Sequence, residues 1–180
     1  MLYTETVESG TLGLLRTLMR DNRLSDFLLA GGTNLALRLG HRYSVDLDLF
    51  SYQHFDIVAH IYPLIDEPFI AENVIRLYSI RDIVAMKLVA ISDSGKRLKD
   101  FVDIAFLSTK MSLTQMLEAY SQKYQRSSSL HALRGLAYFD DINFDVPLNL
   151  INCIFSWEKI EKRIREMIKY ENRIFETAPC

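Results

Sequence analysis

The sequence contains little cysteine: only Cys153 and Cys180 occur among 180 residues. They are far apart, and no CxxC motif or paired-histidine spacing accompanies them, so neither a zinc site nor a disulfide is expected. A disulfide scaffold is unnecessary, because a chain of this length that is 49% hydrophobic can bury a core of its own. This cysteine usage fits a reducing cytoplasm.

Long apolar runs are also missing, and none approaches the roughly 20 residues that a bilayer-spanning helix requires. The N-terminal segment MLYTETVESG lacks the basic start and apolar stretch of a signal peptide. Neither sign of charge dominates, since 21 basic and 23 acidic residues give a formal net charge of −2. We therefore expect a cytoplasmic protein with no membrane association, whose nucleic-acid contacts, if any, come from a local patch.

Apolar periodicity predicts a small sheet with helices in the first part of the chain. The predicted elements are helices over 9–20, 33–39 and 55–65 and strands over 27–30, 44–51 and 71–80. Ser9 or Thr11 is available to cap the first helix. Residues 44–51 alternate strictly, with Val45, Leu47 and Leu49 on one side, as in a half-buried strand.

From residue 79 onward the pattern is almost wholly helical. The predicted helices lie within 81–92, 97–108, 112–124 and 128–139 and from Trp157 to about Phe175, and the clearest loop is 141–150. The predicted fold class is α+β, with a small mixed sheet and flanking helices followed by a helical lobe. The expected domains are 1–78 and 79–180.

Asp46 and Asp48 alternate with the apolar residues of 44–51 and therefore share a strand face. At roughly 3.3 Å of rise per residue, their positions lie about 7 Å apart. Two such carboxylates can converge on one or two divalent cations, and Mg²⁺, which prefers oxygen ligands, is the natural occupant. The alternative is an ordinary strand whose polar face meets solvent.

The turn of Gly31, Gly32 and Thr33 ends one apolar strand and opens a helix just before the acidic segment. Glycine lets the backbone approach a phosphate, and a helix N-terminus offers free N–H groups. A plain strand-to-helix turn explains the same residues. His41 and Arg42 could contact a nucleotide or stabilise the turn. The other histidines have no ligand spacing and are interpreted as surface or packing residues: His54, His60 and His131.

Lys87 is the sole charge within the apolar segment IVAMKLVAI. A helix that is apolar all round is normally buried on most faces, so a lysine there needs a reason. It can reach the surface or pair with an acid, or it can direct its charge at triphosphate oxygens. Asp82 is interpreted as the N-cap of the same helix.

Asp100 and Asp103 are spaced i,i+3 within LKDFVDIAFL and share a helix face. The surrounding residues are apolar, and Asp103 is the more deeply embedded acid. A surface interpretation pairs Lys99 with Asp103 at i,i+4, which stabilises a helix by only a few tenths of a kcal/mol. The other interpretation is an active-site acid beside Lys87.

These segments resemble a known family. GGTNLALRLGHRYSVDLDLF is similar to the first motif of the AbiEii/AbiGii toxin family, within the DNA-polymerase-β-like nucleotidyltransferase superfamily. RDIVAMKLVAI and LKDFVDIAFL are similar to its second and third motifs, and LRGLAYFDDI and the WEKI helix resemble its tail. The resemblance covers nearly the whole chain. It implies a nucleotidyltransferase core over 1–78 and a helical lobe over 79–180 that completes the active-site cleft.

The resemblance also implies a reaction: transfer of a nucleoside monophosphate from an NTP to an acceptor hydroxyl, by the toxin of a toxin–antitoxin pair. Asp46 and Asp48 would hold Mg²⁺ while the turn of residues 31–33 cradles phosphates. Lys87 would neutralise developing charge, and Asp103 would orient or deprotonate the acceptor. Lys99 and Asp100 would support them. The implied partners are a tRNA acceptor and a cognate antitoxin protein.

One departure from the family concerns the middle of the chain. Only 38 residues lie between Asp48 and Lys87, whereas a longer segment with extra strands and a third carboxylate is common in the superfamily. A rival hypothesis is therefore a catalytically silent fold that binds nucleotide, RNA or a protein partner. A third hypothesis keeps catalysis but makes the acceptor a protein side chain or a small molecule.

Overall fold

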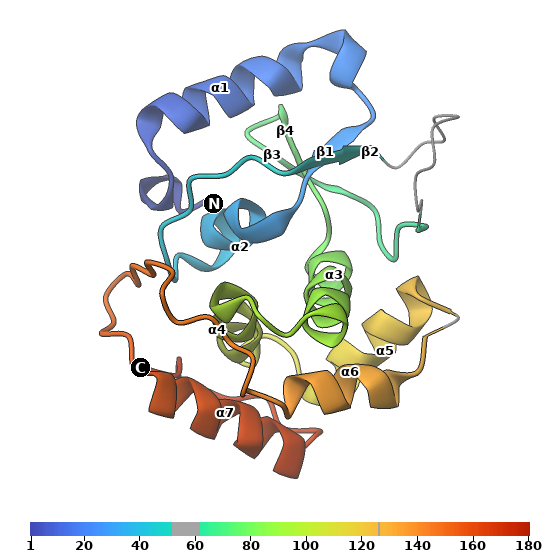
Figure 1. The fold of residues 1–180 in the computed structure, drawn as a ribbon. Helices are drawn as coiled ribbons and strands as arrows, with labels where there is room; N and C mark the ends of the chain where they lie inside the picture. The colour runs from blue at the N-terminus through green and yellow to red at the C-terminus, as the bar shows by residue number, and fades with distance from the viewer. Residues whose placement is uncertain (52–61, 126) are drawn as a thin grey trace. The chain divides into compact units, whose positions relative to one another are not determined.

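The computed structural model describes residues 1–51, 62–125 and 127–180. The chain divides into two compact units, which we call the sheet unit, Met1–Ile83, and the helical unit, Val84–Cys180. A four-stranded mixed sheet with helices comes first and a series of helices follows (Figure 1), so the predicted α+β class is confirmed. Among the described residues, no helix is long and apolar enough to cross a bilayer.

The sheet has the order β2-β1-β4-β3. Its strands are β1 Phe27–Leu29, β2 Leu49–Ser51, β3 Phe69–Ala71 and β4 Ile75–Leu77. Strand β1 pairs antiparallel with β2 and parallel with β4, and β4 pairs antiparallel with β3. The central position of β1 matters for the site, because the glycine turn follows it directly.

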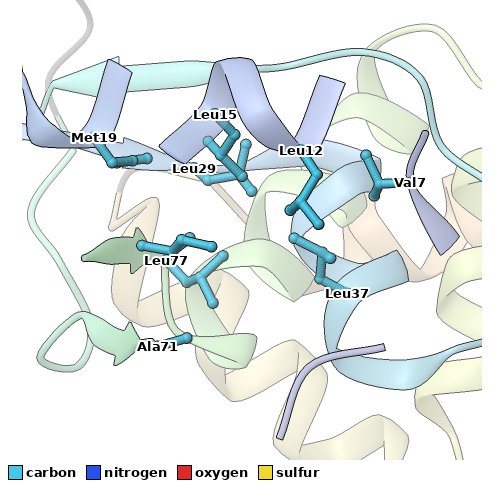
Figure 2. Packing of buried hydrophobic residues seen from close by; sticks show 9 residues of the cluster. Val7, Leu12, Leu15, Met19, Leu29, Leu37, Ala71 and Leu77 are labelled. Atoms are coloured by element: carbon cyan, nitrogen blue, oxygen red, sulfur yellow. The ribbon is translucent and has the colours of Figure 1, made fainter. Parts of the chain in front are cut away.

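Helix α1, Ser9–Arg20, packs its apolar face on this sheet. Figure 2 shows the side chains of α1 meeting those of the strands and of helix α2, Gly31–Leu39. The cluster contains Val7, Leu12, Leu15, Met19, Leu29, Leu37, Ala71, Ile75 and Leu77. The helix over 9–20 was predicted correctly, but the residue before it is Glu8 and no described side chain caps it, so the cap prediction is wrong. Short 3-10 helices, Thr4–Thr6 and Asn22–Leu24, flank α1.

The predicted strand over 44–51 is wrong for most of its length, because within the described chain only Leu49–Ser51 forms β2. The main chain at both ends of residues 44–48 forms hydrogen bonds with residues that belong to no strand. Ser44 N donates to Thr6 O at 3.0 Å, and Ala30 N donates to Asp48 O at 2.8 Å. Val45 is 68% exposed and therefore does not share the half-buried side of Leu47.

The region predicted as one strand within 71–80 contains the end of a hairpin and the start of a helix. Glu72 and Asn73 have φ values of 50° and 57°, the left-handed pair of a type I′ turn, between β3 and β4. The predicted helix over 55–65 and the interpretations of His54 and His60 fall largely on residues 52–61, which lie outside the described residues. The described part, 62–65, is not helical.

The five helices predicted after residue 79 are confirmed. They are α3 Ile80–Asp93, α4 Leu98–Leu107, α5 Leu113–Lys123, α6 Ser129–Leu136 and α7 Trp157–Lys169. Helix α7 ends at Lys169 rather than near Phe175. The predicted loop over 141–150, all of it described, contains an isolated bridge from Asn143 to Arg97 but no helix or strand.

Ser79, not Asp82, caps the start of α3. The Ser79 hydroxyl accepts a hydrogen bond from Asp82 N at 3.0 Å and donates to the Asp82 carboxylate at 2.6 Å. The same carboxylate accepts from Ile65 N at 3.1 Å. Asp82 is fully buried and occupies the third position of the helix, so the N-cap prediction is wrong by one turn.

The expectation of no disulfide is also wrong, because Cys153 and Cys180 are joined with their Cα atoms 5.5 Å apart. Cys153 precedes α7 and Cys180 follows it, so the chain after the helix must turn back. Phe175 belongs to this returning segment: its N–H donates to Ser108 O at 3.0 Å, and its ring lies 4.2 Å from the Arg163 guanidinium. Sequence separation alone does not reveal such a return. The expectation of a reducing compartment thereby loses its support from the cysteines.

Candidate active site

The carboxylate of Asp48 lies directly against Gly31, the first residue of α2. A Cβ atom added to Gly31 would overlap Asp48 Oδ2 and lie 2.9 Å from its Cγ. Gly31 also has φ of +65°, a region that glycine enters without steric cost. The absence of a side chain at residue 31 therefore allows a half-buried carboxylate to sit at the N-terminal turn of a helix.

Arg42 lies against Gly32 in the way that Asp48 lies against Gly31. A Cβ atom on Gly32 would overlap Arg42 Nη2 and lie 3.2 Å from Cζ. The arginine is only 3% exposed, and its Nη1 donates to Tyr43 O at 3.1 Å. The two adjacent glycines thus accommodate an acid and a guanidinium. His41, the residue before the arginine, is buried in the same unit.

Thr33 connects the helix to the acidic segment through its hydroxyl group. Thr33 Oγ1 lies 2.9 Å from Ser44 Oγ and also bonds to the carbonyl oxygen of Asp46. Thr33 and Ser44 are both buried, whereas the Asp46 side chain is exposed. The main chain of the acidic segment is therefore anchored while one carboxylate stays accessible to solvent.

The oxygen donors of this region fit Mg²⁺. In the part of the chain that the structure describes, no three His, Cys, Asp or Glu side chains gather closely enough to form a complete metal cage. Mg²⁺ does not need one, because it retains several waters and is commonly bound by one or two carboxylates together with substrate phosphates. Asp46 and Asp48, one exposed and one seated on Gly31, are the residues that could hold it.

Lys87 lies in the helical unit, where it pairs with two acids of α4. Its Nζ lies 2.5 Å from Asp100 Oδ1 and 2.9 Å from Asp103 Oδ2. All three side chains are buried, and Arg97 Nε lies 3.6 Å from Asp100 Oδ2. Burial acts to lower the pKa of Lys87, but the charges of Asp103 and Asp100 outweigh it and leave that pKa raised. The predicted pairing of this lysine with an acid is therefore present in the structure.

The structure therefore groups the predicted residues within each unit. The sheet unit brings together Gly31, Gly32, Thr33, Arg42, Asp46 and Asp48, and the helical unit brings together Lys87, Asp100 and Asp103. Lys99 is half-exposed on α4. That Asp100 and Asp103 meet one lysine agrees with the prediction that they share a helix face.

Sequence reasoning overlooked Asn34. This side chain is fully buried, and its Nδ2 donates to Leu29 O at 2.7 Å and to Tyr78 O at 3.1 Å. These carbonyls lie at the ends of β1 and β4, so Asn34 holds the two parallel strands beside the glycine turn. The available signal was a second polar residue after Gly-Gly, next to the apolar run of α2.

A family model described as nucleotidyl transferase AbiEii toxin, type IV TA system, matches residues 13–60 and 54–170. The chain belongs to this AbiEii family. The matched segments include the glycine turn, the acidic segment and the Lys87 and Asp103 helices, so the resemblance inferred from the motifs is confirmed.

One relative of this AbiEii protein is an uncharacterized protein of Aquifex aeolicus (strain VF5). The two are 27% identical in an alignment that covers 81% of this chain and 87% of the relative. No solved structure gives a significant match.

Substituting Gly31 by alanine is expected to displace Asp48 and lower nucleotidyl transfer by about tenfold or more, as loss of ligand orientation does at metal sites. The stability cost should be small, about 1 kcal/mol, because the displaced atoms are the end of a side chain and the added strain is that of one left-handed residue. Initial rates and urea unfolding measure the two effects.

Gly13→Ala is the matched control. Gly13 is exposed on α1 with nothing within 4 Å of an added Cβ, so stability should rise by about 0.5–1 kcal/mol and activity should not change. Full activity of the Gly31→Ala variant would contradict the assigned position of Asp48.

Proposed function

We propose that this AbiEii protein transfers a nucleoside monophosphate from an NTP to an acceptor hydroxyl, in a Mg²⁺-dependent reaction. The acceptor oxygen bonds to the α-phosphorus, the bond from that phosphorus to the β-phosphate oxygen breaks, and pyrophosphate leaves. The hydroxyl proton passes to a base. The observation that carries the proposal is the seating of the Asp48 carboxylate on Gly31 at the N-terminal turn of α2.

Charge at this turn supports nucleotide binding. The first N–H groups of a helix lack carbonyl partners within the helix and favour anions. We propose that phosphate oxygens accept hydrogen bonds from the N–H groups of Gly31, Gly32 and Thr33. The Arg42 guanidinium, which can form paired hydrogen bonds with phosphate, is proposed to bind them as well. His41 is proposed to support the same turn.

Asp46 and Asp48 are proposed to hold Mg²⁺. When bound, the ion offsets the negative charge of the phosphates and polarises a phosphoryl oxygen. The two residues themselves supply carboxylate oxygens from a main chain that is hydrogen-bonded at Asp46 O and Asp48 O. This anchoring supports the proposal, because a ligand held in place before the metal binds needs little reorganisation.

Lys87 and Asp103 are proposed to neutralise developing charge and to orient or deprotonate the acceptor hydroxyl, with Lys99 and Asp100 in support. The contact of Lys87 Nζ with Asp103 Oδ2 supports this assignment, because it brings a cation and a hydrogen-bond acceptor together. A purely structural ion pair explains the same contacts, and substitution of Lys87 separates the two roles.

The proposed acceptor is the 3′ end of tRNA, and the proposed protein partner is a cognate antitoxin. Membership of a type IV toxin–antitoxin family supports the antitoxin partner. The tRNA acceptor is proposed from the resemblance of the motifs. The formal net charge of −2 means that RNA would be bound through a local patch rather than through the field of the whole protein. These substrates place the proposed reaction in the cytoplasm.

The test incubates the protein with each NTP labelled at the α-phosphate, together with Mg²⁺ and either total tRNA or a cell lysate. Transfer of label to a macromolecule, abolished by EDTA and restored by added Mg²⁺, is the expected result. NTP binding without transfer to any acceptor would favour the silent module. Transfer that persists in EDTA would overturn the metal assignment but not the transferase.

A further inference from the structure

The acidic segment depends on α2 for its conformation. Residues 44–48 have no strand partner in the described chain, yet they carry the two carboxylates of the proposed metal site. Ser44 N is bonded to Thr6 O, and Asp48 O is bonded to Ala30 N. Between these anchors, the Asp46 carbonyl is held by the Thr33 hydroxyl.

The donors and acceptors in the two hydrogen bonds of Thr33 Oγ1 follow from the single proton of its hydroxyl group. A hydroxyl carries one proton, and a carbonyl oxygen only accepts. Thr33 therefore donates to Asp46 O, and Ser44 Oγ, 2.9 Å away, donates to Thr33. Thr33 is 1% exposed, so its hydroxyl is already committed and lies away from solvent.

We infer that the Thr33 hydroxyl positions the carboxylate pair and does not bind phosphate. The inference rests on the proposed function, in which Thr33 contacts phosphate only through its N–H group. Both acids are held by the start of α2. Asp48 is held by the hydrogen bond from Ala30 N and by its contact with Gly31, and Asp46 is held by the hydrogen bond from the Thr33 hydroxyl. Loss of the hydroxyl frees Asp46 while leaving Asp48 in place, so the spacing of the two carboxylates is no longer set.

The test compares Thr33→Val, which keeps the shape but removes the hydroxyl, with Thr33→Ser, which keeps the hydroxyl. The readouts are the Mg²⁺ concentration for half-maximal transfer, Mn²⁺ affinity measured by electron paramagnetic resonance, and NTP affinity in the absence of metal. Thr33→Val should weaken Mn²⁺ binding and raise the Mg²⁺ requirement by about tenfold, and Thr33→Ser should stay within about twofold of the wild type, as for outer residues that orient metal ligands. Metal-free NTP affinity should not change.

Each outcome decides the inference. The inference is overturned if Thr33→Val keeps the metal dependence of the wild type. It is also overturned if Thr33→Val binds metal-free NTP more weakly, because the Thr33 hydroxyl would then be a phosphate ligand. If the wild type binds Mn²⁺ but transfers no nucleotide, the proposed function fails while the Mn²⁺ affinities still decide the role of Thr33. If the wild type binds no Mn²⁺, the inference and the metal assignment both fail, and the transfer assay alone decides the proposed reaction. Ser44→Ala provides a second variant, expected to shift Mn²⁺ affinity in the same direction because it removes the donor to Thr33.

Discussion

Asp46→Asn and Asp48→Asn, separately and together, are expected to lower nucleotidyl transfer by about a thousandfold, since charge stabilisation of several kcal/mol is lost and about 4 kcal/mol corresponds to that factor in rate. Asparagine keeps the shape of aspartate but removes its negative charge. The main-chain bonds at Asp46 O and Asp48 O do not involve the side chains, so the segment should keep its conformation.

The unfolding free energy of each variant shows whether the loss of activity comes from the lost charge or from an unfolded protein. Asp46 is exposed and Asp48 is half-buried. Neutralising them relieves the repulsion of two neighbouring like charges but removes the favourable interaction of Asp48 with the N-terminal turn of α2, so the unfolding free energy should change by less than about 1 kcal/mol. The matched control is Glu5→Gln/Glu67→Gln, which removes two exposed carboxylates from the same unit and should retain full activity. A stable Asp46→Asn/Asp48→Asn variant with wild-type rates would refute the proposed metal site.

Lys87→Met is expected to lower the unfolding free energy of the helical unit by about 3 to 5 kcal/mol, because it removes the buried cation that Asp100 and Asp103 share. Trp157, the only tryptophan, belongs to this unit and packs against Phe101 and Phe139, so its fluorescence reports unfolding there. Lys110→Met removes an exposed lysine and should change the stability little.

Two further measurements test the origin of the effect. Adding Asp100→Asn and Asp103→Asn to Lys87→Met removes the two negative charges that Lys87 had paired with and should recover part of the lost stability. Because the pKa of Lys87 is raised, its contribution is fully present below the ordinary lysine value of 10.5 and is lost as the pH rises through the folded-state value. The stability difference between the wild type and Lys87→Met should therefore shrink in strongly alkaline solution.

The same variant separates the structural role of Lys87 from a catalytic one. Rates are compared at a temperature where circular dichroism shows both proteins folded. A loss of transfer at constant folded fraction supports a part in the reaction, whereas a rate that follows the folded fraction alone supports a structural ion pair.

The helices and the central strand could be predicted because their signal is local. Apolar residues at helical spacing defined α1, and one short apolar run ending at Gly31 defined β1. The alternation in 44–51 was misleading for the opposite reason. Alternation reports which side chains face inward, but a strand also needs a neighbouring strand, and the described chain provides one only from Leu49 onward.

The candidate site shows the same division. The sequence identified Asp46 and Asp48 as a pair and Lys87 as a charge that needs a partner, because both conclusions follow from residue type and spacing. Only the tertiary structure decided that Asp48 rests on Gly31, that Lys87 meets both Asp100 and Asp103, and that Cys153 reaches Cys180. The physical reason is that periodicity records which faces are buried, whereas the partner of a buried polar group depends on the path of the chain between distant residues.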